Sequence, residues 1–109
     1  MTGRDTTYQD IAPQDAEAVQ NLPGLSVLDF GTDWCGHCVA ARPAVDAWLG
    51  DHAAIEHVRI EDARGRKLGR AYQVKLWPTL VLLRDGEEIA RVVRPRDARD
   101  LWPLDEAVR

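Results

Sequence analysis

The sequence predicts an α/β domain in which helices cover both faces of a mixed β-sheet, a three-layer α/β/α sandwich. Helix-like and strand-like segments alternate in the first two thirds of the chain, which is typical of such layered folds. Near the end, two strand-like segments, Leu80–Leu83 and Glu88–Val93, flank Asp85-Gly86, a strong hairpin signal. Because 109 residues is the size of one ordinary domain, we expect residues 1–109 to form a single domain.

The first half of the chain predicts a helix, a strand and a second helix. Asp10–Asn21 mixes apolar with acidic and amide residues, as a short amphipathic helix does, and Leu22-Pro23-Gly24 ends it. Ser26–Gly31 is almost continuously apolar, which indicates a central strand that is covered on both faces. Cys35–Leu49 has helical spacing, and Pro43 inside it is expected to bend the helix.

The second half adds a strand and two weaker helices around the hairpin. Ile55–Ile60 alternates as a strand does, and Ala63–Tyr72 predicts a basic helix that its glycines weaken. Asp97–Val108 has a helical pattern, and we expect Pro103 to split it into a turn and a short terminal helix.

Composition narrows the classes of function. A formal net charge of −4 argues against nucleic-acid binding, which needs a basic face to neutralise phosphates. No segment approaches the roughly 18 to 20 apolar residues of a membrane helix, so we expect no membrane role. Met1–Asp10 is polar and lacks the pattern of a secretory signal, so the expected compartment is the cytoplasm.

The two cysteines of the chain, Cys35 and Cys38, are three positions apart. That spacing is too short to staple distant segments and suits a redox pair. A structural zinc site would need about four ligands, and beyond the cysteines the chain offers His37, His52 and His57 without a second paired motif. We therefore expect no metal.

Several of these segments together resemble the thioredoxin family. The strand carries Leu28-Asp29-Phe30, the next helix opens with Trp-Cys-Gly-His-Cys at residues 34–38 and contains Pro43, and Trp77-Pro78-Thr79 leads into the hairpin. The Gly-His dipeptide between the cysteines is similar to that of protein disulfide isomerase domains. The resemblance implies a thioredoxin-like fold and a thiol-disulfide oxidoreductase that acts on protein disulfides. The expected cytoplasmic location favours the reductase direction.

The resemblance also assigns roles around the cysteines. A thiolate at a helix N-terminus faces unpaired backbone N–H groups and the positive end of the helix dipole, so Cys35 is the expected nucleophile. Cys38, one turn later, is the expected resolving thiol. A protonated His37 would stabilise the Cys35 thiolate, and we expect a reduction potential above that of thioredoxin.

Asp29 is a carboxylate in an apolar strand, which is costly without a partner. The resemblance implies that it exchanges a proton with the resolving cysteine, a role commonly worth about 10² to 10⁴ in rate. The alternative is an Asp at a strand edge that is bonded to nearby backbone. Where the family has a lysine paired with this acid, the sequence places His57.

The resemblance further implies a substrate groove. Pro78 matches the family's cis-proline, Trp77 would pair its backbone with an extended substrate, and Trp34 would form an apolar rim. Both tryptophans have the alternative of serving as core aromatics, the role expected of Trp48. Arg94 stands where the family has a glycine, so it would narrow the groove and favour acidic partners, or it is simply solvated.

A non-enzymatic binding or assembly-chaperone module of the same fold is the rival hypothesis, and the paired cysteines favour the enzyme. The sequence has no glycine-rich nucleotide loop, so we expect no bound cofactor. Electrons would then arrive from a separate protein reductase of the thioredoxin-reductase type or from the glutathione system. The chain is expected to act as a monomer.

Overall fold

The computed structural model describes residues 15–62 and 67–109. Its elements follow in chain order: α1 (Asp15–Gln20), β1 (Leu25–Gly31), α2 (Gly36–Gly50), β2 (Glu56–Glu61), α3 (Lys67–Ala71), β3 (Thr79–Arg84), β4 (Glu87–Val93), the 3₁₀ turn η1 (Ala98–Leu101) and α4 (Trp102–Ala107).

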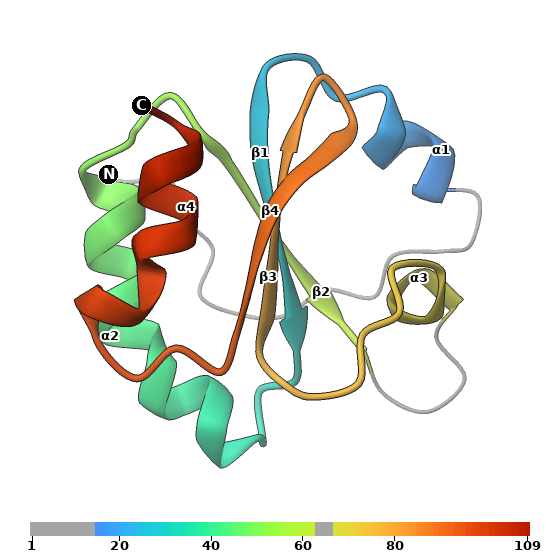
Figure 1. Cartoon of the computed structure of the whole chain (residues 1–109). Coiled ribbons are helices and arrows are strands. Elements are labelled where there is room, and N and C mark those ends of the chain that lie inside the picture. The colour runs from blue at the N-terminus through green and yellow to red at the C-terminus, as the bar shows by residue number, and fades with distance from the viewer. Residues whose placement is uncertain (1–14, 63–66) are drawn as a thin grey trace.

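The strands form one mixed sheet in the order β2-β1-β3-β4. β1 runs parallel to β2 and antiparallel to β3, and the β3–β4 hairpin is antiparallel. Helices α2 and α4 lie on one side of this sheet, and α1 and α3 lie on the other (Figure 1). The predicted α/β/α sandwich with a mixed sheet is therefore confirmed.

Successive side chains along β1 and β3 point to opposite faces of the sheet, because a strand has a period of two residues. They therefore contribute to two separate apolar cores, one on each face. On one face the strand residues pack against α2, η1 and α4; the buried members include Val27, Leu80, Leu82, Val45, Leu49, Leu101 and Leu104. On the other face they pack against α1 and α3; the buried members are Leu28, Phe30, Val81, Leu83, Ile60, Val19 and Leu68. The near-continuous apolar runs of the central strands follow from this burial on both faces.

The predicted hairpin turns at Asp85 and Gly86, both with positive φ, 51° and 85°. This is the type I′ geometry that suits the twist of paired strands. The Asp85 N–H donates to the Gly24 carbonyl oxygen, and the Asp85 carboxylate accepts from the Gly24 N–H, each at close range. A Cβ atom at position 86 would collide with the carbonyl oxygen of Gln20, so this position requires glycine on two grounds.

The predicted helices are helical in the structure, and their bounds differ from the predicted ones. Within the described residues, the first predicted helix is helical at 15–20 and the basic one at 67–71; residues 10–14 and 63–66 lie outside the description. Pro43 lies inside α2 without ending it. Pro103 occupies the first turn of α4 after the 3₁₀ turn η1, which is the predicted split. No described helix has the length and apolar character needed to cross a membrane.

Candidate active site

The two cysteines lie where β1 passes into α2. Cys35 is the N-cap residue, with an extended backbone, and its Sγ accepts a hydrogen bond from the Cys38 N–H over 3.3 Å. Both are free thiols, and Cys35 is 8% exposed against 2% for Cys38. Negative charge on Cys35 would therefore be stabilised by a backbone N–H and the helix dipole, and Cys38 lies one turn deeper.

Two tryptophans border the cysteines on the surface. Trp34 is 73% exposed, and its ring meets that of Trp77 edge-to-face with centroids 5.5 Å apart. Trp77 is half-buried and packs against both cysteines. The core alternative is therefore wrong for Trp34, whereas Trp48, a residue of α2, is half-buried and packs against the core as predicted.

A hydrogen bond to Asp62, a half-buried residue just after β2, fixes the Trp77 ring. The Trp77 Nε1–H donates to Asp62 Oδ2 over 2.8 Å. Burial raises the pKa of the Asp62 carboxyl, and the hydrogen bond from Trp77 partly opposes that rise. Neither the sequence spacing nor the motif pointed to Asp62.

Trp77 and Pro78 are joined by a cis peptide bond, as predicted. Pro78 is buried and lines a pocket together with Cys38. Arg94, just after β4, contacts both residues: its N–H donates to the Pro78 carbonyl oxygen and its Nε–H donates to the Trp77 carbonyl oxygen, each over 2.8 Å. The side chain that replaces the family glycine thus lies against the segment expected to bind substrate.

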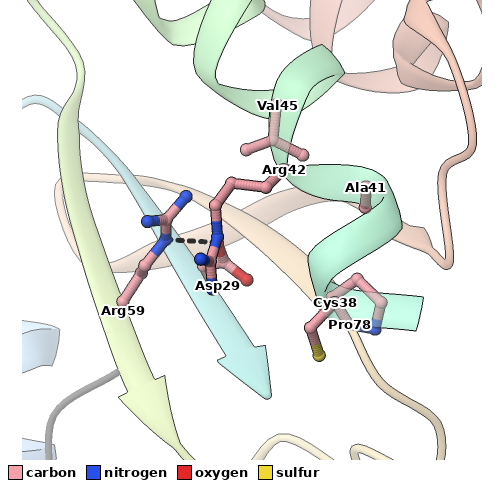
Figure 2. Close-up of a pocket in the computed structure, with 7 residues that line it drawn as sticks. All are labelled: Asp29, Cys38, Ala41, Arg42, Val45, Arg59 and Pro78. Atoms are coloured by element: carbon pink, nitrogen blue, oxygen red, sulfur yellow. Dashed lines mark hydrogen bonds and ion pairs between the residues drawn. The ribbon is translucent and has the colours of Figure 1, made fainter. Parts of the chain in front are cut away.

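Asp29 lies in the central strand β1, behind Cys38, and is 3% exposed. Figure 2 shows the pocket that it shares with Cys38 and Pro78, which is also lined by Ala41, Arg42, Val45 and Arg59. His57 Nε2 lies 3.2 Å from Asp29 Oδ2, and the Arg59 Nε–H donates to the same oxygen over 3.2 Å. The strand-edge alternative is therefore wrong, because Asp29 is central, buried and held by side chains.

The family model that matches the chain is Thioredoxin, over residues 11–104. The chain belongs to the thioredoxin family. Thioredoxin of Chlamydia pneumoniae is 36% identical over 83 residues, covering 74% of this chain and 79% of that protein. Thioredoxin of Chlamydia trachomatis is 30% identical over 94 residues, covering 86% and 92%.

A solved structure agrees over nearly the whole length. Thioredoxin 2 from Pseudomonas aeruginosa PAO1, in its reduced form, superposes with a TM-score of 0.83 at 47% identity and 96% coverage of both chains. Membership in this family and the adjacent cysteine pair show that the chain is a thiol-disulfide oxidoreductase that acts on protein disulfides.

Arg59 is, like Asp62, a site residue that sequence reasoning missed. It faces Asp29 directly in the parallel register of β1 and β2, whereas the sequence placed His57 at that point. Arg59 is buried and also donates from Nη2 to Asp46 Oδ1 of α2 over 2.8 Å. The sequence feature that could have indicated Arg59 is its position as a charged residue between the apolar Val58 and Ile60 of a strand.

A second guanidinium reaches the same pocket. Figure 2 shows the Arg42 side chain descending from α2 toward Asp29. Its Nε and Nη2 are buried and have no hydrogen-bond acceptor among the described residues; its ion-pair partner is Asp33, at 3.6 Å. The lining of the pocket behind Cys38 therefore includes two guanidinium groups, those of Arg42 and Arg59, beside the Asp29 carboxylate.

The remaining histidines lie apart from this pocket. His37 is exposed on the first turn of α2, and its ring makes no hydrogen bond or ion pair with a described residue. His52 stacks on Trp48 at the other end of α2. In residues 15–62 and 67–109, no three His, Cys, Asp or Glu side chains gather closely enough to hold a metal ion.

Proposed function

We propose that this member of the thioredoxin family reduces protein disulfides, with Cys35 as the nucleophile and Cys38 as the resolving thiol. The Cys35 thiolate attacks one sulfur of a substrate disulfide, forming a mixed disulfide and releasing the first substrate thiolate. The Cys38 thiolate then attacks Cys35 Sγ, forming the Cys35–Cys38 disulfide and releasing the second substrate thiolate. Two electrons pass to the substrate, and each released thiolate takes up a proton.

The N-cap geometry of Cys35 is the observation that supports Cys35 attacking first and Cys38 second. Its sulfur accepts the Cys38 N–H, and it is the more exposed of the two thiols, so it is both stabilised as a thiolate and reachable. Cys38 lies one turn deeper, where the mixed disulfide presents it with an intramolecular target at high effective concentration. Exposed on the turn between them, His37 supports the Cys35 thiolate when its ring is protonated.

Asp29 accepts the proton that Cys38 loses as it attacks. The shared pocket supports this role, since no other carboxylate of the described residues lines it. Arg59 and His57 act as positioning residues that hold Asp29 Oδ2. Substrate lies along Trp34, Trp77, Pro78 and Arg94; Trp77 packs against the cysteines, and Arg94 binds the carbonyl oxygens of Trp77 and Pro78.

Electrons return to the disulfide by exchange with a separate reductase of the thioredoxin-reductase type or with the glutathione system. Both supplies operate in a reducing compartment, so we place the protein in the cytoplasm, acting as a monomer and a single domain over residues 1–109.

The test is insulin reduction by the purified protein with dithiothreitol as electron source, together with the reduction potential of the Cys35–Cys38 couple. We expect turnover and a reversible two-electron couple above about −270 mV, because His37 favours the dithiol. The Cys35→Ser/Cys38→Ser double variant should be inactive. A wild type without turnover, or a couple that does not cycle, would instead favour the non-enzymatic binding module.

A further inference from the structure

Arg94 adopts a backbone conformation that side chains rarely take. Its φ is 52°, in the left-handed region that favours glycine. Two hydrogen bonds of 2.8 Å accompany this conformation, from its N–H to the Pro78 carbonyl and from its Nε–H to the Trp77 carbonyl. Arg94 thus binds the main chain of both residues at the expected groove.

The Trp77 carbonyl is the acceptor that an extended substrate needs at this point. When a peptide adds as a strand, its backbone N–H groups donate to main-chain carbonyls of the protein. The Arg94 side chain is exposed and reaches the Trp77 oxygen from the solvent side, as an incoming peptide would. The guanidinium therefore competes with the substrate backbone for one acceptor.

Arg94 forms no ion pair with a carboxylate of the described residues, whereas the nearby arginines do. Arg96 pairs with Asp100, and Arg99 pairs with Asp97. A guanidinium whose Nε is engaged and whose terminal nitrogens face solvent can still bind a carboxylate from a partner, and such bonds are stronger than bonds to neutral acceptors.

We propose that Arg94 is a specificity gate that favours substrates with a carboxylate beside the reacting cysteine. A substrate carboxylate draws the guanidinium away from the Trp77 oxygen, and the substrate N–H takes its place. A neutral substrate must displace Arg94 without that compensation. The inference rests on the proposed disulfide reduction and names the substrate class that the same site prefers.

The experiment compares two disulfide-linked fluorescent peptides. They differ only at the two residues that flank the reacting cysteine, which are both Glu in one peptide and both Gln in the other. For the wild type, we expect kcat/KM to be about three- to tenfold higher for the Glu peptide, the range that one hydrogen bond of ordinary strength sets. The preference should shrink in about 1 M salt, which screens exposed charges. This salt comparison requires no variant.

Arg94→Gly fits the positive φ, so it removes the side chain in a conformation that glycine adopts readily. It should abolish the preference and raise kcat/KM for the Gln peptide. Arg96→Gln removes the same charge two residues away and should keep the wild-type preference. Equal rates on both peptides in the wild type, or an unchanged preference in Arg94→Gly, would overturn the gate.

A small aromatic disulfide, which needs no backbone pairing, separates this inference from the proposed function. A wild type that reduces the small disulfide and both peptides without preference contradicts the gate alone. A wild type that reduces none of the three contradicts the proposed function, and the gate fails with it.

Discussion

Arg59 faces Asp29 across the parallel β1–β2 pair, and its Nε–H donates to Asp29 Oδ2 over 3.2 Å. The same side chain ties Asp29 to Asp46 of α2, the helix that Cys35 caps and that contains Cys38. The pair therefore links the buried carboxylate to the position of the reactive helix.

Replacing Arg59 by Leu should destabilise the fold by about 3 to 5 kcal/mol, because the buried Asp29 carboxylate loses its guanidinium partner and keeps only His57. Urea unfolding at neutral pH measures this loss. Arg99→Leu, on the exposed η1, is the matched control and should change the free energy of unfolding by about 0.5 kcal/mol or less. Similar values for the two variants would show that the Asp29–Arg59 pair is not structurally important.

Asp29→Asn should slow the second chemical step and spare the first. Without a proton acceptor in the pocket, attack by Cys38 on the mixed disulfide should fall by about 10² or more, so the mixed disulfide accumulates. Rapid acid quench followed by intact-mass analysis measures that species over time. If the variant instead slowed formation of the mixed disulfide, Asp29 would act on Cys35 and our assignment would be wrong.

Asp62 should make stability depend on pH. Its pKa is raised by burial, with the Trp77 hydrogen bond opposing, so folding favours the protonated form. The contribution of Asp62 to stability is full below its unfolded pKa of about 3.9 and is lost as pH rises through the folded value. The free energy of unfolding of Asp62→Asn, relative to wild type, should therefore rise between about pH 3 and pH 6.

The control for that series is Glu56→Gln, which removes one exposed carboxylate from β2, the strand just before Asp62. A difference between Asp62→Asn and wild type that falls with pH would contradict the assigned direction.

Gly86→Ala should destabilise the hairpin by more than about 1 kcal/mol, because an alanine is strained at φ 85° and its Cβ would collide with the Gln20 carbonyl. Gly50→Ala is the matched control at the end of α2, where a Cβ meets no atom within 4 Å. It should be neutral or stabilising by up to about 1 kcal/mol. Thermal unfolding of both variants measures the two changes in stability. Equal losses of stability would show that the collision at position 86 does not destabilise the hairpin.

Local patterns were enough to predict the fold. The Asp85-Gly86 turn and the apolar central strands are short-range signals, and the structure has both. The cis bond before Pro78 and the cysteines at the start of α2 follow from the motif. These features depend on residues that are neighbours in sequence.

The register of β1 against β2 could not be predicted in this way. His57 and Arg59 are two positions apart and share one face of the strand, so the sequence could not decide which would lie opposite Asp29. Only the packed sheet puts Arg59 there and lets His57 reach the same oxygen. The Arg94 contact with Trp77 likewise depends on how two distant segments meet.

The most direct test of the account is to trap the mixed disulfide. Cys38→Ser mixed with a disulfide-linked peptide should accumulate a peptide adduct, which mass spectrometry of the digested protein locates on Cys35. Cys35→Ser treated identically should form no adduct, because Cys38 is 2% exposed and lies behind the N-cap. An adduct on Cys38, or none in either variant, would contradict the central claim that Cys35 attacks and Cys38 resolves.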